Sequence, residues 1–103
     1  MLAGSALAAP AQSAADPLVE AAHQAWQRRD AARLAPLVEQ AIAQGHLLAP
    51  WFDYWLQQLR LGSLRSDDFA AFAQRWPGSY VEDRLRNDWL LELGQRADWP
   101  AFA

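Results

Sequence analysis

The sequence predicts an all-α fold in which antiparallel helix hairpins stack on one another as an α-solenoid, or superhelix. No stretch alternates apolar and polar residues with the density of Val, Ile and Thr that strands require, so no sheet is expected. Capping residues, glycines and prolines divide the chain into short segments whose apolar residues recur at helical spacing. In some segments these residues cover too wide an arc for one neighbouring helix to bury, which requires packing on at least two sides.

Composition limits the function before any motif is considered. With 103 residues and 52% hydrophobic content, the chain is long enough for one domain with one core. Its net charge of −3 and the lack of a basic run argue against nucleic acid as a partner. The chain has no cysteine, which excludes disulfides, thiolate metal ligands and cysteine nucleophiles. No apolar run approaches the roughly 20 residues of a membrane-spanning helix.

Residues 1–15 differ in composition from the rest of the chain. They are small and uncharged, and Ala6-Leu7-Ala8 has the A-x-A form that precedes a signal-peptidase cut. A basic region and a full apolar core are both missing from this segment. We therefore expect either the remnant of a signal peptide whose start lies upstream or a flexible Ala-rich tail. Residues 16–103 are expected to form the start of an α-superhelical domain that is truncated at its C-terminal end.

The first two helices are predicted from aspartate caps. Asp16 can accept a hydrogen bond from a free N–H group, and a proline follows it at the first helical position, so a helix is expected over residues 17–29. Asp30 can cap a second helix that runs to about residue 44, where Gly45 supplies a left-handed stop. Pro36 removes one internal hydrogen bond and is expected to kink this helix or to delay its start.

The third and fourth helices are predicted from proline, glycine and serine positions. Pro50 opens the third helix, and Gly62 is expected to end it. Ser66 is expected to cap the fourth helix, and the two aspartates that follow place negative charge at the positive end of the helix dipole. Trp76 should end this helix, because a residue before proline is pushed out of the α region.

The best local signal is the segment Ser79-Tyr80-Val81-Glu82, which has the form of a capping box. It opens a fifth helix, in which Val81, Leu85 and Trp89 form one stripe that should face the core. Gly94 is expected to end this helix. Asp98-Trp99-Pro100 is expected to open a sixth helix.

Two patterns favour stacked hairpins. The helix after Pro50 carries apolar side chains over an arc of roughly 220°, at about 100° per residue. These side chains are Trp51, Phe52, Tyr54, Trp55, Leu56, Leu59 and Leu61. In addition, Asp30, Asp67 and Asp98 begin alternate helices at separations of 37 and 31 residues, which is typical of a helix-hairpin repeat. Each inner helix would therefore lie between the hairpin before it and the hairpin after it.

No residue is predicted to be catalytic, to bind a cofactor or to ligate a metal. The adjacent carboxylates Asp67-Asp68 and Glu82-Asp83 diverge by about 100° on a helix, whereas a general acid and a general base must converge. His23 and His46 have no further ligand at metal-binding spacing. The remaining glutamates have no second polar group nearby, and we interpret them as surface residues: Glu20, Glu39 and Glu92. The tryptophans could stack on sugar rings, but their helical spacing favours core packing.

Two segments carry a resemblance to a known family. They are "LLAPWFDYWLQQLRLG", residues 47–62, and "FAQRWPGSYVEDRLRNDWLLELGQRADWPAF", residues 72–102. Together they combine a helix that opens with proline and aromatic residues, a WPGSY turn, an Arg-Leu-Arg helix and a closing Asp-Trp. This pattern resembles the N-terminal helical region of the soluble lytic murein transglycosylases of Gram-negative bacteria, over roughly residues 17–103.

The resemblance implies a periplasmic protein whose long α-superhelix carries a C-terminal lysozyme-like domain. In this family one glutamate, usually followed by serine, cleaves the MurNAc–GlcNAc bond of peptidoglycan and leaves a 1,6-anhydromuramyl end. The present sequence contains no Glu-Ser pair, so no catalytic residue carries over and the chain should be inactive alone. It would be the non-catalytic start of the superhelix, with peptidoglycan bound through the missing C-terminal domain. The alternative is a self-contained helical-repeat adaptor that binds a protein partner through a concave face.

Overall fold

The computed structural model describes residues 16–96, and this part of the chain is all-α, as predicted, with no strand. Five α-helices and one 3₁₀ turn follow one another within it. Their bounds are α2 Pro17–Gln27, α3 Ala31–Ala43, α4 Ala49–Leu59, η1 Leu61–Ser63, α5 Ser66–Arg75 and α6 Tyr80–Gln95. None of the helices in this range has the length and apolar character that crossing a bilayer requires.

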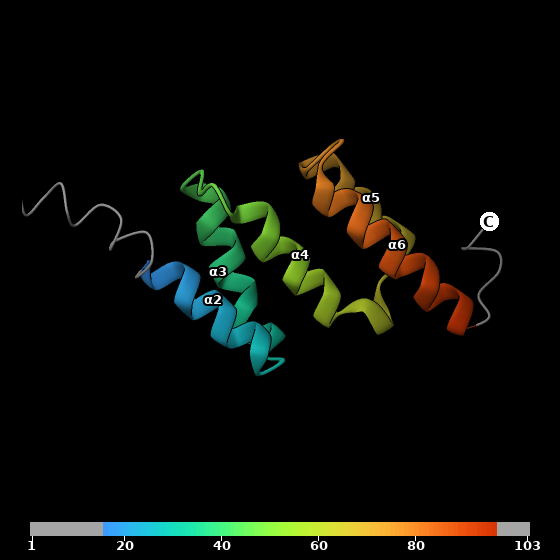
Figure 1. Ribbon diagram of the computed structural model, residues 1–103, viewed down its shortest axis with the longest axis horizontal. Helices are drawn as coiled ribbons and strands as arrows, with labels where there is room; N and C mark the ends of the chain where they lie inside the picture. The colour runs from blue at the N-terminus through green and yellow to red at the C-terminus, as the bar shows by residue number, and fades with distance from the viewer. Residues whose placement is uncertain (1–15, 97–103) are drawn as a thin grey trace, which may run out of the picture.

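The helices form two hairpins with one helix between them. Figure 1 shows the α2–α3 hairpin at one side, α4 in the middle and the α5–α6 hairpin at the other side. Helix α4 packs against both α2 and α3, and it also packs against α6 and η1. It is therefore the element that joins the two halves of the described chain.

The predicted caps Asp16 and Asp30 are confirmed. An Oδ1 atom of Asp16 accepts a hydrogen bond from the N–H of Leu18 at 2.9 Å, and Asp30 Oδ1 accepts one from the N–H of Arg33 at 3.0 Å. The left-handed stop after α3 is also confirmed, because Gly45 has a φ of 66°. Such a backbone conformation strains any residue that has a Cβ atom, which explains glycine at this position.

Two details of the first hairpin differ from the prediction. Helix α2 ends at Gln27 rather than at residue 29, because Arg29 takes a left-handed conformation with a φ of 55° and stops the helix without a glycine. The predicted delay at Pro36 is wrong, since α3 begins directly after Asp30 and continues through the proline. One missing N–H group does not outweigh the packing of the rest of the helix.

The bounds of α4 and α5 also correct the prediction. Helix α4 begins one residue before Pro50 and ends at Leu59, and Gly62 lies inside the 3₁₀ turn rather than at a helix stop. The chain tightens there because the N–H of Arg60 is shared between the carbonyls of Leu56 and Gln57 in the last turn of α4. Ser66 is the first residue of α5 and not its cap, and the side chain of Asp68 instead accepts a hydrogen bond from the N–H of Arg65 at 2.9 Å. Helix α5 ends at Arg75, and Trp76 stops it as predicted, since it is the C-cap and has a non-helical conformation.

Helix α6 opens as predicted but does not end as predicted. Ser79 Oγ accepts a hydrogen bond from the N–H of Glu82 at 3.2 Å. The returning bond of the capping box falls one residue earlier than expected, because Glu82 Oε1 accepts from the N–H of Gly78 at 2.9 Å. The helix continues through Gly94, which is therefore not its stop. The sixth helix predicted from Asp98 lies outside the described residues.

Within residues 16–96, two hydrophobic clusters form the core, and α4 contributes to both. The first lies between α2, α3 and α4 and consists of Ala22, Ala25, Leu34, Val38, Ala41, Ala49, Phe52 and Leu56. The second lies between α4, the η1 segment, α5 and α6 and consists of Tyr54, Leu64, Phe72, Val81, Leu85, Trp89 and Leu93. The wide apolar arc of α4 is thus buried on two sides, as its sequence requires.

The second cluster places Trp89 where its spacing predicted. Val81, Leu85 and Trp89 are buried in one stripe of α6. The ring of Trp89 stacks on that of Phe69 with a centroid distance of 5.2 Å, while Leu91 on another face of α6 is 62% exposed. This tryptophan is a core residue and does not form an exposed platform for a sugar.

Candidate functional site

The most unusual side chain in the core is the carboxylate of Asp53. It lies on α4 with 1% of its surface exposed, in a helix whose other buried residues are mainly apolar. Asp53 Oδ2 accepts hydrogen bonds from Arg75 Nε at 2.7 Å and from Trp76 Nε1 at 2.9 Å. Asp53 Oδ1 accepts a third from Gln57 Nε2 at 3.0 Å, one helical turn away. These bonds replace the water that a buried carboxylate loses.

The position of each partner follows from a local feature of the chain. Gln57 lies four residues after Asp53, so both side chains share one face of α4. Arg75 and Trp76 stand at the C-terminal end of α5, where Pro77 ends the helix and fixes Trp76 in a non-helical conformation. The buried carboxylate therefore connects the α4 helix to the end of α5.

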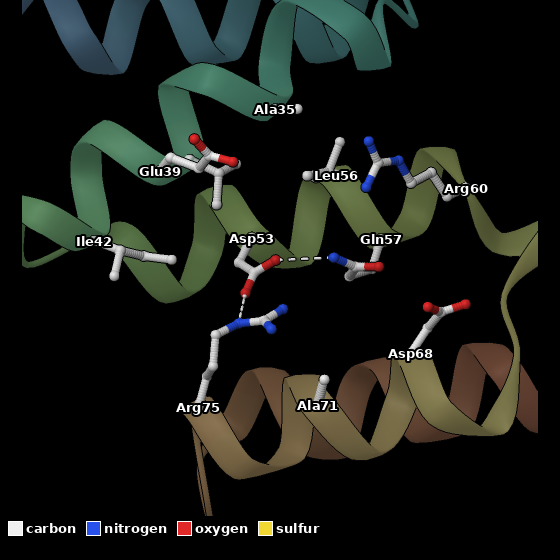
Figure 2. A pocket seen from close by; sticks show the side chains of 11 residues that line it. Ala35, Glu39, Ile42, Asp53, Leu56, Gln57, Arg60, Asp68, Ala71 and Arg75 are labelled. Carbon is white, nitrogen blue, oxygen red and sulfur yellow. Dashed lines mark hydrogen bonds and ion pairs between the residues drawn. The ribbon is translucent and has the colours of Figure 1, made fainter.

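A cleft of about 360 Å³ opens beside this cluster. Helix α4 forms its floor, and α3 and α5 form its two walls, as Figure 2 shows. The apolar lining comes from Ala35, Val38, Ile42, Leu56 and Ala71, and the polar lining comes from Glu39, Asp53, Gln57, Arg60, Asp68 and Arg75. The cleft is thus a groove in which apolar side chains alternate with polar side chains that carry charges of both signs.

A second polar cluster lies between α4 and α6. The hydroxyl of Tyr54 donates a hydrogen bond of 2.6 Å to Asp88 Oδ2, and it accepts a weaker one of 3.4 Å from Gln58 Nε2. Burial raises the pKa of the Tyr54 phenol above its usual value, and the bond to the Asp88 carboxylate raises that pKa further. The phenol therefore stays protonated and acts as a donor that joins the two helices.

The two histidines make contacts that connect neighbouring parts of the fold. His46 Nε2 contacts Asp16 Oδ2 at 2.9 Å, and His46 Nδ1 accepts a hydrogen bond of 3.0 Å from the N–H of Leu48. A neutral imidazole with its proton on Nε2 satisfies both contacts. The hydrogen bond with His46 lowers the pKa of the Asp16 carboxyl below its usual 3.8. His23 packs its ring against Trp26 and Trp55, with centroid distances of 5.7 Å to each.

Two of the glutamates considered in the sequence, Glu82 and Glu92, form ion pairs with arginines four residues later. Glu82 accepts from Gly78 and pairs with Arg86 at 2.7 Å, and Glu92 pairs with Arg96 at 3.6 Å. Within residues 16–96, no group of three or more His, Cys, Asp or Glu residues is arranged to hold a metal ion. The structure does bring Glu39 and Asp68 to one cleft, from α3 and α5, which their distance in sequence concealed.

The sequence analysis did not identify the Asp53 site, although the sequence contains one signal for it. Asp53 and Gln57 stand four residues apart in a helix that is otherwise rich in aromatic residues. A polar pair at this spacing inside an apolar arc indicates a buried hydrogen-bonded group. The partners on α5 could not be recognised in the same way, because 22 residues separate Arg75 from Asp53.

Comparisons of this chain with protein-family models, with curated proteins and with solved structures find no match. The functional argument therefore depends on the residues and the geometry described above.

Proposed function

We propose that this chain is a non-catalytic superhelical segment of a peptidoglycan lytic transglycosylase that acts in the periplasm. The complete enzyme would cleave glycan strands between MurNAc and GlcNAc and leave 1,6-anhydromuramyl ends. The sequence support is the resemblance carried by residues 47–62 and 72–102. The geometric observation that supports the proposal best is the burial of α4 on two sides, by two separate clusters. An inner helix of stacked hairpins needs this arrangement.

In this role the chain helps to shape the superhelix and contributes no catalytic residue. The helix pairs would continue into further layers of an α-solenoid and hold a downstream catalytic domain against the glycan strand. Adjacent layers in such a structure contact only their neighbours, so each layer can set the curvature of the next. Mixed charges on the cleft between α3 and α5 would then lie on the surface of the superhelix.

The experiment begins with the genomic reading frame that contains this sequence. The proposal expects several hundred further codons after Ala103, with a lysozyme-like segment that contains a Glu-Ser pair. The protein from that frame should release 1,6-anhydro-muropeptides from purified murein, as measured by mass spectrometry. The matched control is a Glu→Gln change in its Glu-Ser pair, which should abolish the release. The 103-residue chain alone should release none.

A stop codon directly after Ala103 would exclude the transglycosylase proposal. It would favour the second candidate function, a self-contained helical-repeat adaptor that binds a protein partner. The observation that favours this candidate is the cleft, because a groove with side chains from three helices is a common binding surface in helical-repeat proteins.

A further inference from the structure

The cleft between α3 and α5 presents a hydrogen-bond acceptor and donors that the described fold does not use. Gln57 is 7% exposed, and its Nε2 atom is held by Asp53 Oδ1. Its amide oxygen points away from Asp53 in Figure 2, and no hydrogen bond to that oxygen forms within residues 16–96. Arg75 is held through Nε by Asp53 Oδ2, and its two Nη groups form no hydrogen bond within the same range.

One buried carboxylate therefore positions both groups. The three hydrogen bonds to Asp53 fix the orientation of the Gln57 amide and of the Arg75 guanidinium before any ligand arrives. Side chains that are held in this way bind with a smaller loss of conformational entropy than free ones. An acceptor and a donor held side by side match the N–H and C=O groups of a peptide main chain.

Two charged side chains distinguish the ends of the cleft on its α3 side, since Figure 2 shows Glu39 toward one end and Arg60 toward the other, with Asp68 of α5 also at the Arg60 end. Glu39 lies on the α3 wall, Asp68 lies on the α5 wall, and Arg60, the C-cap of α4, lies at the end of the floor. None of the three forms an ion pair with another residue in the part of the chain that the structure describes. Asp53 and Arg60 stand seven positions apart along α4 and its C-cap, a rise of about 10 Å, which equals the length of an extended tripeptide. Alanines in both walls leave room for it.

We propose that this cleft binds a short, extended peptide through its main chain. Gln57 Oε1 accepts a peptide N–H, the Nη groups of Arg75 donate to a peptide carbonyl, and Arg60 pairs with the terminal carboxylate. The ammonium end of the peptide lies toward Glu39. This inference goes beyond the proposed scaffold function and does not depend on it.

The test is a titration of the ¹⁵N-labelled 103-residue chain with tri-alanine, followed by NMR. We expect saturable shifts of the Gln57 side-chain amide and of the Trp76 indole N–H, which donates to Asp53. Gln57→Leu should weaken the binding about fivefold, the usual effect of one lost hydrogen bond. Gln58→Leu is the matched control, since Gln58 contacts Trp26 and Tyr54 on another face of α4 and should bind tri-alanine normally. Shifts that do not saturate, or equal weakening by both changes, would overturn the proposal.

A second variant tests the orientation of the bound peptide in the cleft without altering buried residues. Arg60 is exposed, and Arg60→Gln should remove the preference for tri-alanine over its C-terminal amide. Arg33→Gln, at an exposed position of α3 outside the cleft, should keep that preference. If the unaltered chain binds tri-alanine and its amide equally, the assigned role of Arg60 is wrong and the peptide proposal fails with it.

Discussion

At the scale of single residues, the stability of the fold depends on how the Asp53 carboxylate is compensated. A buried ion loses most of its hydration, and its attraction to a partner roughly offsets this loss only when all its hydrogen bonds are made. Asp53 makes three such bonds, two of them to residues at the end of α5. Removal of the carboxylate therefore leaves the donor groups of three partly or fully buried side chains without their acceptor.

We predict that Asp53→Ala lowers the free energy of unfolding by about 3 kcal/mol, because it leaves Gln57, Arg75 and Trp76 without their acceptor. This is the low end of the usual range, since Arg75 is partly exposed and can recover water. Denaturant titration followed by circular dichroism measures the effect. Asp83→Ala is the control, because the Asp83 side chain is 80% exposed and should change stability by less than about 0.5 kcal/mol. Equal effects of the two changes would contradict a structural role for Asp53.

A second prediction concerns Trp89, whose side chain fills the space between α6 and α5. Trp89→Ala should cost about 3–5 kcal/mol, because the helices cannot easily close the cavity that remains. A domain of this size usually has only about 5–15 kcal/mol in total, so the variant should be largely unfolded at moderate temperature. Thermal melting followed by circular dichroism checks this. Retention of the wild-type melting temperature would show that Trp89 is not a core residue.

At the scale of elements, the N-terminus of α2 is held to the turn between α3 and α4 by the contact of Asp16 with His46. The bond with His46 lowers the pKa of Asp16 in the folded state below 3.8. A carboxyl whose pKa is lower in the folded state than in the unfolded state stabilises the fold at pH values above its unfolded-state pKa. This stabilisation is lost as the pH falls below 3.8 toward the folded-state pKa.

We therefore expect the stability difference between the wild type and Asp16→Asn to shrink as the pH is lowered through this window. Asparagine can still cap the helix, so the remaining difference reports on the carboxylate charge. Urea unfolding measured between about pH 2 and pH 6 tests this expectation. Two stability curves that run parallel over the whole range would refute it.

Helix starts could be predicted from the sequence better than helix ends. Asp16, Asp30 and Ser79 cap their helices through local bonds, so the chain itself contains the necessary information. Glycine permits a stop without imposing one, and Gly62 and Gly94 take no left-handed conformation in the described structure. Helix packing and hydrogen bonding decided those ends instead.

The Asp53 cluster could be predicted only in part, for a different reason. The contact with Gln57 is local and follows from helical spacing, but the contacts with Arg75 and Trp76 depend on how α5 returns to α4. No local pattern specifies that return. The same limit applies to the cleft, whose walls come from helices separated by the whole of α4.

At the scale of the whole molecule, α4 couples the two clusters. Its residues Phe52 and Leu56 belong to the first cluster, and Tyr54 belongs to the second. Loss of either cluster exposes one side of α4, so neither half should remain folded alone.

We predict one cooperative unfolding transition in guanidinium chloride. Helix content and tryptophan fluorescence should change at the same denaturant concentration, because Trp26 and Trp55 stack at 5.1 Å in the first half and Trp89 lies in the second. Circular dichroism and fluorescence recorded on the same samples provide the comparison. Two separated transitions would mean that α4 does not couple the clusters.

The same double burial of α4 predicts where the chain can change over evolutionary time. Six of its 11 residues are buried, namely Ala49, Phe52, Asp53, Tyr54, Leu56 and Gln57, whereas α5 has one buried residue among 10. A substitution in α4 therefore disturbs two packing surfaces at once, and most alternatives are removed by selection for a folded protein. Helix α5 can accumulate neutral changes on its exposed faces. Among homologous chains, α4 should be the segment that diverges most slowly and α5 the helix that drifts most freely.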